Sequence, residues 1–576
     1  MRPPSWIRGY GAGDLGADAV AGIVVAVVVV PQSLAYAILA GLPPEAGLYA
    51  SILPLVGYAV FGSSRTMAVG PVAVLALLTA TAVGRVAEPG SNEAMAAAAM
   101  LAGCVAVVLL GLGLFQLGWL ASLLSYPVVQ GFISAAALII AVSQLDALLG
   151  IPSASSQPLA SLATLPERLR ALHAPTLMLG LASLLALVFA RRGLPSLLGR
   201  GGLGDTAARM IARSAPALVL ATATALTYAL GLEEAGVAVV GHVPAGLPAL
   251  TMPDVDTQLV RELAPAAILI SLVAFVESVA IAQALAARQR RRINPDRELL
   301  GLGAANAAAA VSSGFPVAGG FSRSSVNHEA GARSPIAGLF TAGGIALITW
   351  GATPLLYHLP HTALAAAIIV AVLSLIDLCD LQRIWAYSRS DGLAMVVTVA
   401  GVLVAGVETG LLTGVAFALA AFLWRTGRPH IAVVGRVPGT EHFRNRERHA
   451  VTTLPEVAGI RIDESLYFAN IRYLTDCVWQ QVAADERIRE VVLMCPAVNQ
   501  VDASAVAGLR ELNSRLADAG VRLHFSEVKG PVMDALQRSL LFSELTGEVF
   551  LSHHQAIQTL AAARPDSASG HQPGHL

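Results

Sequence analysis

Two breaks in otherwise apolar stretches contain the residues best suited to hold a ligand. One is Gly70-Pro71-Val72-Ala73, and the other is Gly319-Gly320-Phe321-Ser322-Arg323-Ser324-Ser325. A helix that begins at such a break has unpaired backbone N–H groups and about half a positive charge at its N-terminus. The serine hydroxyls add hydrogen-bond donors and Arg323 adds a full positive charge. Two such helix ends facing each other would bind a small anion. In the alternative interpretation Pro71 is a helix kink, and Arg323 is an interfacial anchor whose charged end reaches the lipid headgroups.

Glu277 is an ionisable residue in the middle of an apolar run, Ile268–Leu285. An ionisable side chain at that depth in a membrane costs at least a few kcal/mol and is usually functional. A carboxylate beside an anion site repels the ligand unless the carboxylate is protonated or paired. We therefore predict that Glu277 takes up a coupling proton, so that proton and anion enter together. The alternative is a static Glu277–Arg323 ion pair that only holds two helices together.

The first three-quarters of the chain has the composition of a membrane protein. The whole chain is 55% hydrophobic and 13% charged, whereas soluble domains average about 25% charged residues. A bilayer-spanning helix needs roughly 20 apolar residues. The sequence predicts about fourteen membrane segments, of which those beginning near Pro71 and near Phe321 are too short or too interrupted to span alone. Thirteen segments lie near 19–40, 46–62, 70–84, 95–119, 127–149, 174–190, 214–231, 265–287, 299–313, 336–351, 361–376, 392–406 and 409–424, and a shorter one follows the Ser/Arg cluster at 321–326.

The arginines predict the orientation of these segments. They cluster at 191–213, at 288–297 and at 383–389, each time after an even-numbered segment. Because arginine-rich loops stay in the cytoplasm, both termini are predicted to be cytoplasmic. The richness in Ala, Gly, Val and Arg is typical of a GC-rich bacterial gene, so we expect a multi-pass protein of a bacterial plasma (inner) membrane.

The polar segments repeat weakly along the chain. Gln32–Ala37 resembles Glu277–Ala282, and Pro71-Val72-Ala73 matches Pro316-Val317-Ala318 at the same offset. That offset spans an odd number of segments, so the second copy is inverted in the membrane. The pattern predicts an inverted-topology repeat, roughly 15–230 and 260–425, with a binding site near the membrane midplane at the repeat interface.

A different pattern begins near residue 430, where charged residues become frequent and short strands alternate with amphipathic helices. This predicts a small α/β layer fold. We expect a membrane domain at 1–430, a soluble domain at 431–564 and a disordered polar tail at 565–576. The predicted strands are 459–462, 466–469, 490–494 and 521–525, and the predicted helices are 470–485, 503–519 and 531–539.

Several stretches together make the chain similar to the SulP family of sulfate permeases, whose animal relatives include prestin and pendrin. They are Pro31-Gln32-Ser33-Leu34-Ala35-Tyr36, Gly41-Leu42-Pro43-Pro44, Gly47-Leu48-Tyr49, Val69-Gly70-Pro71, Gly131-Phe132, Ala136-Ala137-Leu138-Ile139-Ile140, Phe321-Ser322-Arg323-Ser324 and Val326-Asn327.

The resemblance implies fourteen segments in two inverted repeats of seven. It also implies a core domain that moves as an elevator against a gate domain, usually in a homodimer. The implied anion site lies between the ends of the third and tenth segments, and the hydroxyl of Ser324 is a further candidate donor. By motif, the site falls on Gln32, Tyr36, Val72, Ala73, Phe321, Ser322 and Arg323.

One departure from the family bears on the coupling ion. Sodium-coupled bicarbonate members resembling this chain have Asp followed four residues later by Thr in the eighth segment. Here Glu277 is followed by Ile281, which has no oxygen for sodium. This favours proton symport or anion exchange.

The C-terminal part resembles the STAS domain that SulP proteins contain, which is related to anti-sigma-factor antagonists. The matching motif is Val501-Asp502-Ala503-Ser504-Ala505. In the antagonists the residue after the Asp is a phosphorylated Ser or Thr, whereas here it is Ala503, so we expect no such switch. We interpret Ser504 as a hydroxyl that caps the start of a helix.

These features favour secondary active transport of a small anion, with sulfate as the first candidate. Bicarbonate or a C4-dicarboxylate such as fumarate as the substrate, and an anion channel on the same fold, remain alternatives. An enzyme is not expected, because the sequence has no nucleotide-binding loop, no metal-spaced His/Cys cluster and no nucleophile–His pair in context. No cofactor, metal or nucleic-acid partner is expected.

Overall fold

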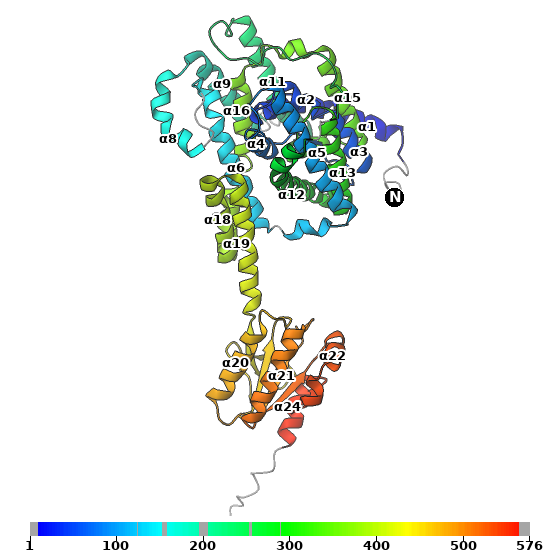
Figure 1. Ribbon diagram of the computed structural model, residues 1–576, viewed down its shortest axis with the longest axis vertical. Coiled ribbons are helices and arrows are strands. Elements are labelled where there is room, and N and C mark those ends of the chain that lie inside the picture. The colour runs from blue at the N-terminus through cyan, green and yellow to red at the C-terminus, as the bar shows by residue number, and fades with distance from the viewer. Residues whose placement is uncertain are drawn as a thin grey trace, which may run out of the picture. The chain divides into compact units, whose positions relative to one another are not determined.

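The computed structural model of the chain describes residues 10–123, 125–152, 158–194, 205–252, 256–288 and 290–563. The chain divides into two compact units, one ending at Ala418 and the other beginning at Leu419 (Figure 1). The predicted tail at 565–576 lies outside the described residues.

Two sets of seven helical segments lie among the described residues from Ala12 to Gly427, and the last of these helices crosses the boundary between the two units. The first set is α1 (Ala12–Leu39), α2 with α3 (Pro44–Tyr49, Leu53–Phe61), β1 with α4 (Val69–Gly70, Ala73–Val83), α5 (Asn92–Leu114), α6 with α7 (Tyr126–Ser143, Leu145–Leu149), α9 (Ala174–Arg192) and α11 (Asp205–Ala229). The second set is α12 (Thr257–Arg288), α13 (Pro295–Val311), β2 with α14 (Ala318–Gly319, Phe321–Glu329), α15 (Ile336–Gly351), α16 (His361–Leu373), α18 (Arg389–Ala405) and α19 (Val407–Gly427). Short connecting helices are η1 (Gly118–Leu123), α8 (Pro158–Arg168), η2 (Leu169–Ala171), η3 (Thr353–Leu356) and α17 (Leu378–Tyr387).

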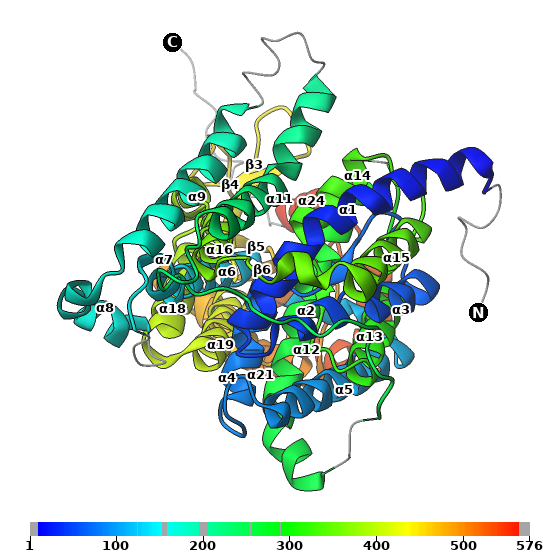
Figure 2. The ribbon, with the colours of Figure 1, turned by 90° about the horizontal axis from the view of Figure 1, so that it is seen from above.

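The two sets are related as an inverted repeat, and helices of each set pack against helices of the other. The third segment of each is a two-residue strand followed by a short helix, and the two strands pair antiparallel. Helix α1 packs against α15 of the other set, just as α12 packs against α5 (Figure 2). Likewise α9 packs against α16, and α6 against α18. This arrangement confirms the predicted fold class, a helical membrane protein built from two inverted sets of seven.

Length and composition fit a membrane environment. In the described part of the chain, seven helices are long and apolar enough to cross a bilayer, and α4, α15, α16 and part of α11 are shorter apolar helices. Large apolar side chains such as Val107, Trp350 and Val404 are exposed. Such side chains are favourable on a surface that faces lipid and unfavourable on one that faces water.

Small residues let the second segments of the two sets approach each other closely. A Cβ atom at Gly57 of α3 would lie 2.7 Å from the Ala304 carbonyl oxygen of α13, and one at Gly301 would lie 2.7 Å from the Gly62 Cα. Membrane helices pack by such backbone approach because lipid supplies no hydrophobic drive to association. The segments α1–α5 and α12–α15 form what we call the core group, and the remaining helices of the first unit form the gate group.

One sequence match behind the predicted repeat is out of register. Pro71 follows β1 and leads into α4, whereas Pro316 precedes β2. The residue that occupies the place of Pro71 in the second set is Gly320. The match with Pro316-Val317-Ala318 therefore arose by chance in a sequence rich in Ala, Val and Pro.

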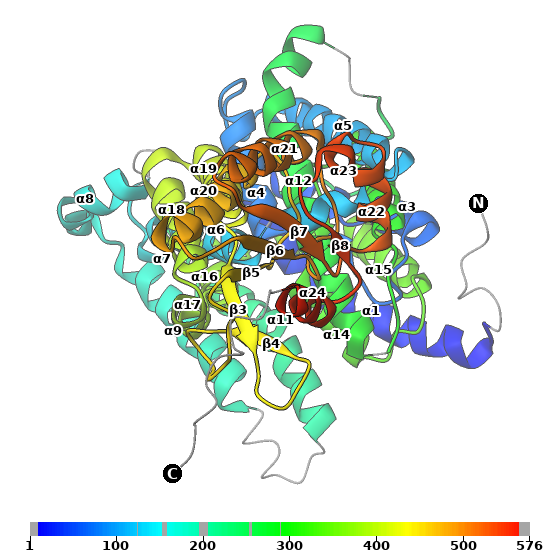
Figure 3. The same cartoon turned by 90° about the horizontal axis from the view of Figure 1, so that it is seen from below.

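The second unit is a six-stranded sheet with helices on both faces. Its strand order is β4-β3-β5-β6-β7-β8, with the last four parallel and the others antiparallel. Helices α20 and α21 lie on one face and α24 lies on the other (Figure 3). The strands are β3 (Ile431–Arg436), β4 (Phe443–Asn445), β5 (Val457–Ile462), β6 (Glu490–Met494), β7 (Arg522–Ser526) and β8 (Val549–Phe550). The helices are α20 (Ile471–Ala484), α21 (Ala503–Asp518), α22 (Gly530–Gln537), α23 (Leu541–Glu544) and α24 (His553–Ala562).

The predicted strand at 466–469 is wrong. Leu466 makes a single bridge to Val501, and the chain then turns into α20. The side chain of Asn470 holds this turn, because its Oδ1 accepts a hydrogen bond from the Tyr467 N–H at 3.0 Å. Side chains of this type favour turns over strands.

The interpretation of Ser504 as a helix cap is also wrong. The cap of α21 is Asp502, whose Oδ1 accepts a hydrogen bond from the Ala505 N–H at 2.7 Å. Its Oδ2 accepts a second one from the Phe468 N–H at 2.9 Å. Ser504 is exposed. The carboxylate of Asp502 thus joins two loops and leaves the hydroxyl of Ser504 facing solvent.

A buried histidine in the second unit should make that unit sensitive to acid. His553 is 0% exposed, its Nδ1 lies 2.9 Å from the Ser526 Oγ, and burial lowers its pKa from 6.5 to about 4. Between these two values the unfolded chain binds a proton that the folded unit does not. Stability therefore falls as the pH drops from about 6.5 to about 4, by roughly 3 kcal/mol in all.

Pulse proteolysis of the full chain in urea, scored on fragments from 431–563, measures this loss. We expect the unit to be about 2 kcal/mol less stable at pH 5 than at pH 7. His553→Gln should flatten this slope, whereas His442→Gln, at an exposed histidine of the same unit, should preserve it. Equal slopes in the two variants would refute the assignment.

Candidate functional site

The two breaks identified in the sequence meet in the core group. Strand β1 pairs with β2 through Val69↔Gly319 and Gly70↔Ala318. Helix α4 begins at Ala73 and α14 begins at Phe321, so both helix N-termini emerge at this two-stranded pair. Neither N-terminus has a side-chain cap. The first N–H groups of both helices are therefore suited to bind an anion.

Buried polar side chains fix the strand pair in place. Asn306 of α13 spans the backbone of Val317, accepting from its N–H at 3.0 Å and donating to its carbonyl at 3.0 Å. The Oγ of Ser278 accepts from the Gly319 N–H at 2.9 Å. Asn327 of α14 donates to the Thr66 carbonyl at 3.0 Å, just before β1. Each of these bonds links a helix to a strand or its flanking loop, so the helix ends are positioned before any ligand arrives.

Arg323 bridges the two breaks. Its side chain is buried, with the residue 3% exposed, and its Nη2 donates a hydrogen bond to the carbonyl of Pro71. A Cβ atom on Gly70 would lie 2.6 Å from its Nη1, so glycine at that position leaves room for the guanidinium. The alternative in which Arg323 reaches lipid headgroups is wrong, because the side chain turns inward against the other repeat.

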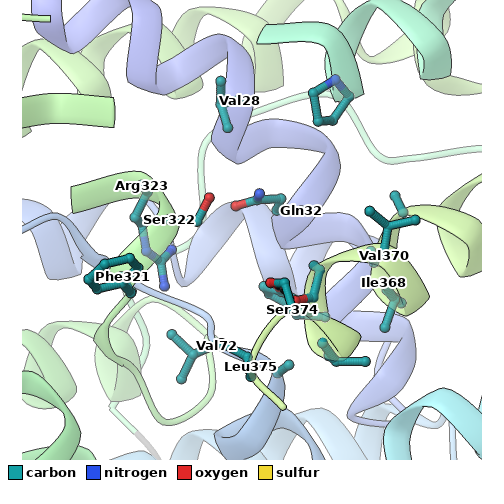
Figure 4. Close-up of a pocket in the computed structure, with 18 of the residues that line it drawn as sticks. Val28, Gln32, Val72, Phe321, Ser322, Arg323, Ile368, Val370, Ser374 and Leu375 are labelled. Carbon is teal, nitrogen blue, oxygen red and sulfur yellow. Dashed lines mark hydrogen bonds between the residues drawn. The ribbon is translucent and has the colours of Figure 1, made fainter. Parts of the chain in front are cut away.

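The helix ends open into a cavity of about 740 Å³ between the core and gate groups. Figure 4 shows the Ser322 hydroxyl and the Gln32 amide turned toward the same space. The candidate residues that line this cavity are Gln32, Tyr36, Val72, Ala73, Phe321, Ser322, Arg323 and Glu277. Ser325, which belongs to the same serine cluster, also lines it.

Ser324 lies outside the cavity lining. It is 0% exposed, and its Oγ accepts a hydrogen bond from the Ala68 N–H at 3.0 Å. Because its hydroxyl points back at the loop before β1, Ser324 holds that loop in place. Of the predicted anion donors, it is the one that the structure separates from the others.

The gate group supplies the opposite wall, which the sequence did not reveal. Arg191 of α9 lines the cavity and donates from Nη1 to the Val370 carbonyl at 3.0 Å. Ser374 and Leu375, which follow α16, face the helix ends (Figure 4). The arginine cluster at 191–213 had indicated only membrane orientation. No helix break marks α9 or α16, so no local signal pointed to them.

Glu277 lines the same cavity from α12. Among the described ion pairs, none within 4.0 Å joins its carboxylate to the guanidinium of Arg323. The static pair considered as an alternative is therefore not formed. The described residues also include no group of three His, Cys, Asp or Glu that could hold a metal ion. The arrangement offers an anion two helix N-termini and the guanidinium of Arg323, with Arg191 on the opposite wall and the carboxylate of Glu277 in the same lining.

A single hydroxyl should control the order of β2. Ser278→Ala removes the acceptor of the buried Gly319 N–H, which costs about 1–3 kcal/mol. Amide exchange measured by mass spectrometry on peptides covering 315–325 should then speed up by about five- to a hundredfold. Ser271→Ala is the matched control on the same helix, since that equally buried hydroxyl donates to the Ala267 carbonyl of its own helix at 2.7 Å. Equal exchange in both variants would contradict the role of Ser278.

Comparison with known proteins gives the same picture over nearly the whole chain. The Sulfate permease family matches residues 15–398 and the STAS domain family matches residues 449–556. The chain is 35% identical over 570 residues to "Sulfate transporter 4.1, chloroplastic" of Arabidopsis thaliana, which covers 96% of this chain and 81% of that protein. It is 32% identical over 556 residues to "Probable sulfate transporter MT1781" of Mycobacterium tuberculosis, at 96% and 95% coverage. This chain also superposes on the solved structure of the murine Solute Carrier 26 family member A9 anion transporter in the inward-facing state, with a TM-score of 0.87 and 23% identity. The match covers 97% of this chain and 93% of that one, so the two share the fold.

Proposed function

The chain belongs to the sulfate permease family, whose members are membrane anion transporters and not enzymes, and we propose that the anion it transports is sulfate. The observation that carries this proposal is the meeting of two uncapped helix N-termini and a buried arginine at one cavity. The relatives named above as sulfate transporters support sulfate over other oxyanions.

The proposed binding mode uses backbone more than side chains. The N–H groups at the starts of α4 and α14 would donate to sulfate oxygens, with Ser322 and Gln32 adding side-chain donors. Arg323 would supply the full charge from behind the helix ends. Val72, Ala73, Phe321 and Tyr36 would complete the pocket and exclude water, which strengthens each hydrogen bond to the anion.

We place the transport step at the boundary between the core and gate groups. The anion would sit on the core group, while the wall facing it comes from α9, α11 and α16. Sliding of the core group past this wall would expose the same site to each side in turn, as in an elevator. Glu277 would take up the coupling proton in a symport cycle, and anion exchange is the other cycle that the site allows.

The remaining proposals concern the setting of the protein. We propose a bacterial inner-membrane homodimer with both termini in the cytoplasm. Residues 1–430 would form the transport domain and 431–564 a cytoplasmic STAS domain.

Uptake into proteoliposomes tests the proposal directly. Purified full-length protein should accumulate labelled sulfate with saturation, and faster under an inward proton gradient. Labelled bicarbonate and fumarate, offered in parallel, test the alternative substrates. Saturable uptake of either without sulfate uptake would overturn the choice of sulfate, and ohmic anion current would overturn coupled transport.

A further inference from the structure

A second polar pocket lies in the core group, away from the cavity between the groups. It has a volume of about 230 Å³ and lies where the loop after α3 meets the loop between α12 and α13. None of its lining residues lines the larger cavity. Its polar lining consists of Ser63, Ser64, Arg65, Thr66, Arg291 and Arg292.

Glu298 fixes the loop that forms one side of this pocket. This residue of α13 is 0% exposed, and its carboxylate accepts from the N–H groups of Ser63 and Ser64 at 3.0 and 2.9 Å. It also accepts from the Tyr58 hydroxyl at 2.7 Å and from the hydroxyl of Ser63. At the other end of the loop, the Thr66 carbonyl accepts from Asn327. The loop is therefore held at both ends.

The positive charges in the pocket are not held in close ion pairs, although Asp14 attracts Arg65 from beyond ion-pair distance. Arg65 lies close enough to Arg291 for the two guanidinium groups to repel each other. Within the described residues, no ion pair within 4.0 Å involves Arg65, Arg291 or Arg292. Three carboxylates of the neighbouring segments make their closest contacts with other groups. Glu298 accepts from neutral donors, Asp296 accepts from the Gly118 N–H at 2.8 Å, and Asp14 pairs with Arg333 at 2.7 Å.

We propose that this pocket is a second oxyanion site, which takes a phosphate- or sulfate-type group. Guanidinium forks match such oxygens in a bidentate manner, and serine and threonine hydroxyls complete the donor set. The arginine-rich loops are those predicted to face the cytoplasm, at a membrane boundary. The group can therefore belong to a free anion or to a lipid headgroup. Because Thr66 is three residues before β1, an anion here would stabilise the strand pair that positions α4.

The test compares two variants that remove equal charge from the full chain. R65Q/R291Q alters the pocket, whereas R383Q/R389Q alters exposed arginines on α17 and α18. In one arm, inorganic phosphate is titrated into delipidated, detergent-purified protein and the thermal midpoint is followed. In the other arm, protein from vesicles of phosphatidylcholine with phosphatidylglycerol is examined for retained lipid by native mass spectrometry.

We expect R65Q/R291Q to need at least tenfold more phosphate for half its thermal shift, or to retain at least threefold less phosphatidylglycerol, while the control matches the wild type. A loss in the first arm identifies a free oxyanion and a loss in the second identifies a headgroup. R291Q alone changes only an exposed loop residue, so it should fold even if the double variant does not. It should show a several-fold loss, smaller than that of the double variant. Equal behaviour of R65Q/R291Q and the control in both arms overturns the site. Sulfate uptake is measured separately, so the site and the proposed function can fail independently.

Discussion

Arg323→Gln should lower the apparent affinity for sulfate about a hundredfold in proteoliposome uptake. The wild-type guanidinium is buried beside the two helix ends and donates to the Pro71 carbonyl. At an effective dielectric constant of about 20, a unit charge roughly 5 Å from an anion contributes about 3 kcal/mol. Removing it corresponds to about a hundredfold rise in KM. Glutamine keeps one amide donor near Pro71, so that loss of charge is the main change.

Two further variants separate charge from disruption. Arg333→Gln removes an arginine that pairs with Asp14 beyond α14, and it should leave KM within twofold of the wild type. Arg323→Lys keeps the charge but not the planar fork, so its KM should lie between those of the wild type and the glutamine variant. If Arg323→Gln transports sulfate with an unchanged KM, the guanidinium only braces the strand pair.

The two helix breaks at the cavity could be predicted because their signal is local. Glycine and proline stop a helix within the residues that contain them, and serine and arginine in an apolar chain have few structural reasons to be there. Gly70-Pro71 and Gly319-Gly320 therefore marked the starts of α4 and α14. The apolar runs likewise predicted the other membrane segments, because the bilayer imposes length and composition on each one separately.

The opposite wall of the cavity depends on packing and left no local trace. Arg191 and Ser374 line the cavity because α9 and α16 pack against each other and together form part of one wall of it. Ser324 shows the converse: it shares a motif with Ser322, yet its place on α14 turns its hydroxyl to Ala68. Neighbours along a helix point in different directions, so a run of serines cannot say which hydroxyl meets the ligand. The predicted match between Pro71 and Pro316 was out of register for a related reason. Alanine, valine and proline are so common in this sequence that short matches between them do not align the two copies.

The carboxylate of Glu277 would repel an anion bound in the cavity. Glu277 and Arg323 line the same space, and no ion pair within 4.0 Å joins them among the described residues. An anion entering this space would meet a negative charge as well as a positive one. Protonation of Glu277 removes the repulsion, and release of the proton would help to expel the anion. In the proposed symport cycle, proton binding and anion binding would therefore favour each other.

Glu277→Gln should abolish proton-driven accumulation while sulfate binding survives. Glutamine imitates the protonated acid in shape and charge, so the site stays permanently in its anion-accepting form. For one coupled proton, each pH unit across the membrane supports about a tenfold sulfate gradient in the wild type. The variant should equilibrate sulfate without exceeding the outside concentration, whatever the pH gradient. Glu262→Gln is the control, because Glu262 is an exposed carboxylate on the same helix. This variant should accumulate sulfate as the wild type does. Accumulation by Glu277→Gln at the wild-type level would assign the coupling to another group, and a wild type indifferent to pH would point to anion exchange.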